Sequence, residues 1–194
     1  MMKIADKIDT GIMDNPAYSN ILTRVSVRRY TDEPVDDEEI SAILHAAMSA
    51  PSGVNKQPWE FIVVNEPELL HKLADTLPYA KMAAQAPVAI VICGNKERML
   101  TGVDDNLWEQ DCSAASENVL LAAHALGLGG VWTCLYPHQV RIEPVKKILN
   151  IGDNLIPFNL IPIGHPVADH APMNKWCPER IHFNRLSSGC GLDE

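Results

Sequence analysis

Two short segments of the chain carry side chains whose types and spacing could bind a charged ligand. In the first segment, Arg24, Ser26 and Arg28 occupy alternate positions. They share one face if the backbone is extended, and the two arginines share a face, at i and i+4, if it is helical. Either way two guanidinium groups converge, and guanidinium suits bidentate binding of phosphate. The alternative is a solvated basic cluster, neutralised by the acidic run 36–39.

The second segment, residues 50–59, is a loop of small and hydrogen-bonding residues that leads into the apolar run Trp59–Val64. Its Pro-Ser-Gly sequence favours a turn, and Gly53 allows the backbone to approach a ligand closely. Asn55 offers both a donor and an acceptor, which matches the edge of a pyrimidine-like ring. The two segments together predict a site for a flat, polar heterocycle that carries a phosphate.

With these motifs the chain resembles the nitroreductase-like family of flavoproteins, whose members bind FMN. The Pro-Ser-Gly-x-Asn segment is the specific part of the resemblance, since Arg-x-Ser-x-Arg alone is a weak signal. The similarity extends from about Arg24 to Asn184, nearly the whole chain. The matching segments are Arg-x-Ser-x-Arg at 24–28, Pro-Ser-Gly-x-Asn-x-Gln-Pro-Trp at 51–59, Ala-Leu-Gly-Leu-Gly-Gly-Val-Trp at 125–132 and Leu-Ile-Pro-Ile-Gly-His-Pro at 160–166.

The resemblance implies an FMN site that residues of two subunits build together. Arg24 and Arg28 would bind the phosphate or the ring edge, with Ser26 and the backbone of Val25 assisting. The other subunit would supply a loop made of Pro51, Ser52, Gly53 and Asn55.

Further implied contacts come from the second half of the chain. A strand end beneath the flavin ring would present backbone N–H groups to flavin N5; it consists of Trp132, Thr133, Cys134 and Leu135. Lys175 lies where the family places a phosphate-binding cation. Two positions depart from the family pattern, because Met173 stands where relatives often carry a second Lys or Arg, and Leu186 where many have Trp. The departures bear on FMN affinity and on the dimer edge.

The activity that the resemblance implies is an FMN-dependent oxidoreductase, which takes hydride from NADPH or NADH. The acceptors would be nitroaromatics, quinones or similar small electrophiles, with no catalytic side chain because the chemistry occurs on the flavin. The segment Gly127–Gly130 lacks the third glycine of a dinucleotide fingerprint and precedes a strand. A nicotinamide without a fold of its own would stack on the flavin, transfer hydride and leave, which predicts ping-pong kinetics.

Three alternatives remain open from the sequence. One is a specialised flavin reductase or dehalogenase of the same fold, for which residues 95–106 are the candidate lid. A second is a flavin-binding protein without turnover, and a third is a structural dimer with a vestigial site. The shape of the pocket over the flavin, which no motif encodes, decides the acceptor and the preferred nicotinamide.

Composition limits the partners and the compartment. The 194 residues suit a single domain, 1–194, and the net charge of −9 argues against nucleic acid or an anionic membrane as partner. No apolar run approaches the length of a membrane span. The five cysteines, at 93, 112, 134, 177 and 190, contain no Cys-x-x-Cys pair. They are poor material for a disulfide framework or a zinc site and indicate a reducing, cytoplasmic location.

Two isolated candidates for other chemistry are weaker. His165, Asp169 and His170 could be imagined as metal ligands, but the irregular chain around Pro166 fixes no common geometry. Cys134 could be a reactive thiol, although its position at a strand end favours a packing or backbone role. The sequence therefore predicts no metal centre.

Apolar periodicity predicts helices over 36–49, 68–77, 104–126 and 138–150, and strands over 59–65, 88–93, 130–135 and 159–163. This mixture predicts an α+β fold. The resemblance makes it an α/β/α sandwich around a central mixed, mainly antiparallel sheet. The apolar seam of the long helix suits either burial in one core or a dimer interface.

The C-terminal stretch, about 165–194, is irregular until residues 180–185, which alternate like a strand. A lone strand is not stable and must join a sheet. The resemblance implies that this arm crosses to the partner subunit of an obligate homodimer and is exchanged there.

Overall fold

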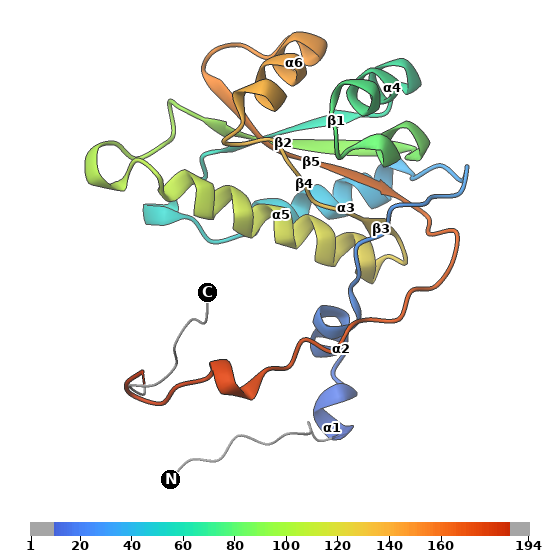
Figure 1. The fold of residues 1–194 in the computed structure, drawn as a ribbon, viewed down its shortest axis with the longest axis vertical. Coiled ribbons are helices and arrows are strands. Elements are labelled where there is room, and N and C mark those ends of the chain that lie inside the picture. Colours follow the sequence, from blue (N-terminus) through green and yellow to red (C-terminus); the bar gives the residue numbers. More distant parts are fainter. Residues whose placement is uncertain (1–9, 187–194) are drawn as a thin grey trace.

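The computed structural model describes residues 10–186, which fold around one sheet of five strands (Figure 1). The strand order is β1-β2-β5-β3, and the short β4 also pairs with β5. Every pairing of named strands is antiparallel, and the parallel contact is an isolated bridge between Ser26 and Gly130. The strands are β1 (Trp59–Val64), β2 (Val88–Asn95), β3 (Gly129–Gly130), β4 (Thr133–Cys134) and β5 (Leu155–Gly164).

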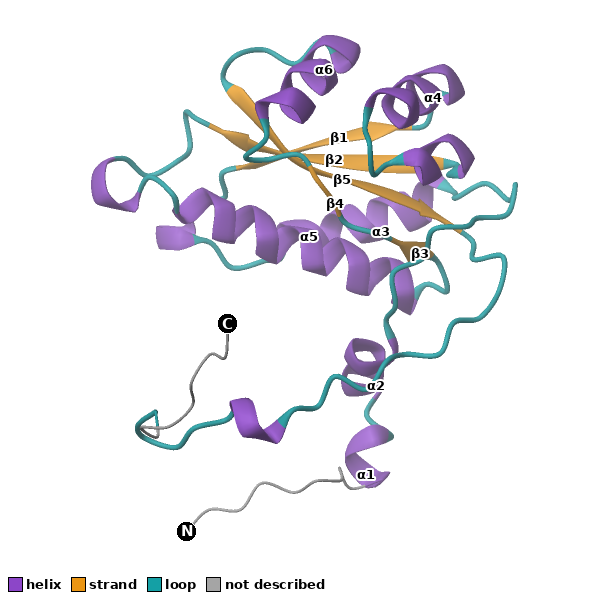
Figure 2. Ribbon diagram, in the orientation of Figure 1, coloured by secondary structure: helices purple, strands orange, loops and turns teal. Residues whose placement is uncertain are grey.

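Helices cover both faces of this sheet (Figure 2). One face carries α3 (Asp37–Met48) and α5 (Leu107–Ala125), and the other carries α4 (Pro67–Thr76) and α6 (Gln139–Leu149). The predicted α+β fold with its antiparallel sheet is therefore confirmed, and the layers are α/β/α.

Strand β2 forms the centre of both cores, because all eight of its residues are buried. Successive side chains of a strand point to opposite faces. Ile90 and Ile92 accordingly pack on the side of α3 and α5, whereas Val91 and Cys93 pack on the side of α4 and α6. A continuous apolar run is what a strand covered on both faces requires.

A short polar chain of hydrogen bonds links α5 to the sheet inside the first core. Asn159 of β5 donates from Nδ2 to Ser116 Oγ at 2.7 Å, and Ser116 donates to the Cys112 carbonyl at 2.6 Å. Both polar side chains are fully buried. Asn159 Oδ1 is buried without a partner among the described residues, so the Nδ2 bond to Ser116 is the polar contact through which this amide ties β5 to α5.

The four predicted helices are present with bounds that differ by a few residues. The start of α3 is set by a capping box, in which Asp36 accepts from the Glu39 N–H and Glu39 accepts from the Asp36 N–H. The apolar seam along α5 is buried within this protomer from Trp108 to Val119, while Leu126 at its end is exposed. Burial in the protomer's own core therefore accounts for most of that seam.

Two helices were missed by the sequence analysis, the short α1 (Thr10–Met13) and α2 (Pro16–Thr23). The start of α2 carried a readable signal. Asn15 caps it by accepting from two backbone N–H groups, and Pro16 occupies the first helical position.

Two strand predictions need correction. The run 130–135 is split into β3 and β4, because the chain leaves the sheet between Gly130 and Thr133. The segment 180–185 is not a strand in this protomer. It continues a 3-10 turn at Pro178–Arg180 and bends at Asn184, whose φ is 62°. A strand needs a neighbouring edge, and the segment pairs with none in the described part of the chain.

The C-terminal arm leaves the sandwich after β5 (Figure 1). Pro166 bridges Tyr30, and the Val167 N–H donates to the Arg29 carbonyl at 3.2 Å. Beyond that point the residues up to Leu186 are exposed apart from a half-buried Cys177. Across residues 10–186, no helix combines the length and apolar character that crossing a membrane needs.

Gly129 allows the Arg-x-Ser-x-Arg segment to lie against the sheet. A Cβ at this position would overlap the side chain of Val27. We expect Gly129→Ala to lower the free energy of unfolding by about 1–3 kcal/mol, as overpacked cores do. Urea denaturation followed by fluorescence measures this.

Gly53→Ala is the matched control for that substitution, because its Cβ would meet Leu107 and Leu100 at 3.5 and 3.6 Å, ordinary contact distances. Equal unfolding midpoints for the two variants would contradict the packing argument.

Candidate functional site

A pocket of about 520 Å³ lies beside the end of β4, within the range of small-molecule sites. Its walls are partly apolar, from Pro78, Met82, Val131 and Trp132. Three cationic side chains also line it: Arg28, Lys81 and Arg141. None of its described lining residues is acidic. The combination suits a flat ligand with a negative or electron-rich edge.

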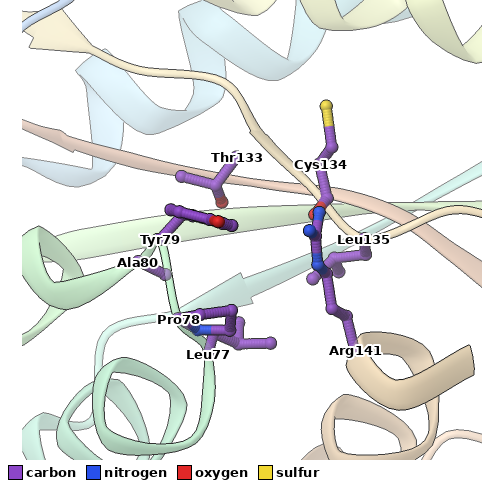
Figure 3. Close-up of a pocket in the computed structure, with 8 residues that line it drawn as sticks. All are labelled: Leu77, Pro78, Tyr79, Ala80, Thr133, Cys134, Leu135 and Arg141. Atoms are coloured by element: carbon purple, nitrogen blue, oxygen red, sulfur yellow. The ribbon is translucent and has the colours of Figure 1, made fainter. Parts of the chain in front are cut away.

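A smaller hollow, of about 10 Å³, adjoins this pocket and has room for about one water. Figure 3 shows Tyr79 and Arg141 pointing toward each other across it, with Thr133 behind. Thr133 is held in place by donating from Oγ1 to the Leu160 carbonyl at 2.6 Å. The floor of the site is therefore rigid.

The Arg-x-Ser-x-Arg segment is extended, which decides between the two conformations that the spacing allowed. The Val27 N–H donates to the Gly130 carbonyl at 3.0 Å, and Val27 is buried. Ser26 and Arg28 on either side of it are exposed. Arg28 lines the pocket, whereas Arg24 and Ser26 do not.

Arg24 instead lies against α5. Its Nε atom is 3.4 Å from Glu117 Oε1, and its side chain is 17 % exposed. The Nη1 atom is buried without a hydrogen-bond partner among the described residues. A buried guanidinium N–H without an acceptor is costly, so this atom is suited to an anionic ligand.

The same face of α5 anchors α2 through uncharged contacts. Asn20 donates to the Leu121 carbonyl at 3.0 Å, and Thr23 Oγ1 lies 2.9 Å from His124 Nε2. Burial, and then the nearby Arg24 charge, lower the pKa of His124. A neutral His124 therefore accompanies the Arg24 guanidinium.

The loop after Ala50 has an unusual backbone. Val54, Asn55 and Gln57 all have positive φ, between 48° and 55°. Such conformations cost about 1–3 kcal/mol each and persist where surrounding contacts enforce them. The Gly53 N–H donates to Asp111 Oδ1 of α5 at 2.9 Å, and Ser52 Oγ accepts from the Gln57 N–H at 3.0 Å.

Within one protomer this loop and the pocket are separate. No residue of 51–57 lines the pocket, and the loop packs instead on the start of α5. The candidate lid, 95–106, also lies by the loop, since Leu100 is next to Gly53. That the loop completes the site of a partner subunit stays a prediction.

The arm residues are likewise apart from the pocket. Lys175, Met173 and Leu186 are all exposed, and none of them lines it. A role for Lys175 in binding phosphate stays a prediction.

Cys93 and Cys112 are buried, Cys177 is half-buried and Cys134 is exposed, while Cys190 lies outside the described residues. Burial raises the pKa of Cys93 to about 12 and also raises the pKa of Cys112, so both remain protonated thiols in the core. Cys134 is exposed, and its Sγ points away from Tyr79 and Arg141 (Figure 3).

The described residues contain no cluster of three or more potential metal ligands. His165 contacts the Pro34 carbonyl at 3.2 Å and lies 3.8 Å from Glu33. These two contacts account for the position of the His165 side chain without a metal.

Comparison with known proteins identifies the family of this chain. The profile of the Nitroreductase family matches residues 21–78 and 65–165. The chain belongs to the nitroreductase family. A relative from Methanothermobacter thermautotrophicus, provisionally named NADH dehydrogenase/NAD(P)H nitroreductase, is 41 % identical over 95 % of each chain. The oxygen-insensitive NADPH nitroreductase of Salmonella typhimurium is 31 % identical, over 93 % of this chain and 77 % of its own.

Solved structures agree with this membership. A Bacteroides thetaiotaomicron protein with the same provisional name is 44 % identical, with a TM-score of 0.84 over 89 % of this chain and 99 % of its own. A provisionally assigned nitroreductase from Desulfovibrio desulfuricans, solved in complex with FMN, is 33 % identical, with a TM-score of 0.75 over 89 % and 99 % of the two chains.

Sequence analysis of this nitroreductase-family chain missed three polar residues of the pocket: Tyr79, Lys81 and Arg141. Tyr79 lies in the turn after α4, Lys81 begins the 3-10 helix η2 (Lys81–Gln85), and Arg141 lies in the first turn of α6. A tyrosine and a lysine in a short link between a helix and a strand were a usable signal. No signal pointed to Arg141, whose helix was correctly predicted as a structural element.

Asp111 is 8 % exposed and holds the strained loop. We expect Asp111→Ala to lower the free energy of unfolding by about 1–3 kcal/mol, because the Gly53 N–H loses its acceptor. Hydrogen exchange of the Gly53 amide should become faster. Asp111→Asn, which keeps an acceptor oxygen, is the control and should retain most of the protection; unchanged exchange in the Ala variant would disprove this role.

Proposed function

We propose that this protein is an FMN-dependent oxidoreductase that takes hydride from NADPH or NADH and reduces nitroaromatics, quinones or similar small electrophiles. The observation that carries the proposal is the pocket, whose apolar wall adjoins Thr133 and Cys134 and whose rim carries Arg28 and Lys81. This arrangement fits a flavin ring, which is flat, apolar on its faces and electron-rich along one edge.

When bound, FMN supplies the hydride-transfer chemistry, and the protein supplies placement and electrostatics. The cationic rim favours negative charge on a ligand in the pocket. The wall from Val131 to Cys134 gives a flat surface next to strand β5. No acid or base is required from the side chains that line the pocket.

The phosphate half of the proposed site rests on Arg24. Its buried Nη1 has no partner among residues 10–186, and its Nε is held by Glu117. We infer that this guanidinium, ion-paired through Nε and without an acceptor at the covered Nη1, binds the phosphate oxyanion when FMN is present. The phosphate half of the proposed site is completed by Ser26, the Val25 backbone, Arg28 and, from the arm, Lys175.

We also infer that the active form is a homodimer of single-domain subunits. The arm carries exposed apolar side chains, including Trp176, Ile181 and Phe183. Several exposed apolar side chains on one segment favour a protein interface. The loop with Pro51, Ser52, Gly53 and Asn55 lies away from its own pocket, so a partner's pocket is the place where it could contact FMN.

The donor would bind only transiently. The pocket opens to solvent, and Gly127 has a φ of 79° in a turn that ends α5 instead of cradling a dinucleotide. Donor and acceptor would then use the same face in turn, which gives ping-pong kinetics.

The direct test is the visible spectrum of the purified, untagged protein, recorded before and after anaerobic NADPH or NADH. We expect two-banded oxidised-flavin absorption that bleaches with at least one donor. A flavin spectrum that neither donor bleaches would favour a binding protein without turnover. A colourless protein that fails to take up FMN would overturn the site.

Arg24→Ala should weaken FMN binding by about tenfold or more, because a charge-assisted contact to phosphate is lost. Fluorescence titration of apoprotein with FMN measures the dissociation constant. Arg29→Ala removes the same charge from an exposed neighbour outside the pocket lining and should leave FMN binding unchanged. Equal affinities for the two variants would contradict the role of Arg24.

A further inference from the structure

We propose that Arg141 and Tyr79 select planar acceptors that carry a carboxylate, so that the pocket prefers acidic aromatic substrates to neutral ones of the same shape. The substrate class rests on the proposed reductase function. The anion recognition rests on the geometry of the pocket alone.

Arg141 is held in position before any ligand binds. Its Nη1 donates to the Cys134 carbonyl at 3.1 Å, and its guanidinium carbon lies 5.3 Å from the centroid of the Tyr79 ring. These contacts come from two sides, the end of β4 and the link after α4 (Figure 3). A guanidinium restrained in this way loses little entropy when it binds an anion.

The charge of Arg141 is not neutralised by the protein. Within residues 10–186 it forms no ion pair, and neither does Arg28 across the pocket. Elsewhere on α6, Lys146 is paired with Asp153 at 2.7 Å. Lys81, the third cation of the rim, is paired with Asp75 at 3.9 Å. In a chain of net charge −9, the two rim arginines that lack an ion pair among the described residues are a local exception that attracts carboxylates.

Tyr79 supplies the surface for the ring of the ligand. Its side chain is 70 % exposed, and an aromatic ring open to solvent at a pocket is suited to stacking with another planar ring. The two side chains together therefore suit an aromatic carboxylate: the Arg141 guanidinium binds its charge, and the Tyr79 ring stacks on its planar ring. A neutral amide of the same shape lacks the charge.

The test compares 4-nitrobenzoate with 4-nitrobenzamide as acceptors for the flavin-loaded enzyme. Reduction of either nitro group to nitroso consumes one NADPH and one proton, and releases NADP⁺ and water. The variants are Arg141→Gln, Arg141→Lys and, as matched control, Lys147→Gln, which removes an exposed positive charge from the same helix but away from the pocket lining. Calorimetric binding of benzoate and benzamide gives a readout that does not depend on turnover.

We expect wild type to favour nitrobenzoate by about tenfold in kcat/KM, in line with a charge-assisted contact. Arg141→Gln should remove most of this preference, Arg141→Lys should keep a larger part of it, and Lys147→Gln should leave it intact. Benzoate binding should follow the same order.

Flavin content, measured for every variant, separates the two proposals. Normal flavin and donor oxidation with the same acceptor preference in Arg141→Gln would overturn this inference and leave the reductase function standing. A protein without flavin that still binds benzoate through Arg141 would overturn the reductase function and support the anion site.

Discussion

The packing of α5 against the sheet is the constraint on which both halves of the candidate site depend. The apolar seam of α5 packs in the core on one face of the sheet, and a buried network from Asn159 through Ser116 to the Cys112 carbonyl adds a polar contact. The helix then presents Asp111 to the strained loop and Glu117 to Arg24. A shift of α5 would therefore disturb both contacts.

The second constraint is the break between β3 and β4. If the chain had stayed paired with β5 from Gly130 onward, Val131 and Trp132 would lie within the sheet. Instead they form the wall of the pocket, while the bonds of Thr133 return the chain to β5. Gly129 allows this arrangement, since Val27 occupies the space where a Cβ would lie.

Charge is distributed unevenly over the molecule. The overall balance is acidic, yet the pocket rim is cationic and Arg24 keeps one buried N–H without a partner. The buried Nη1 of Arg24 carries a cost in folding free energy, and Arg28 and Arg141 form no ion pair among residues 10–186. That cost is intelligible if a flavin phosphate and an acidic acceptor supply the missing partners, as proposed.

The sequence by itself determined the longer elements and pointed to the family. Apolar periodicity located α3 to α6 and the three long strands, since burial on one face or two leaves a periodic pattern. Local motifs also marked Arg28 and the Thr133–Cys134 strand end, both of which line the pocket. Only the tertiary structure decided that Arg24 contacts Glu117, that the loop 51–57 is remote from its own pocket, and that Tyr79 and Arg141 meet. The contacts of the loop with Asp111 and of Arg24 with Glu117 join residues 58 and 93 positions apart in the sequence. No local spacing encodes contacts over such separations, because the packing of helices on the sheet sets them.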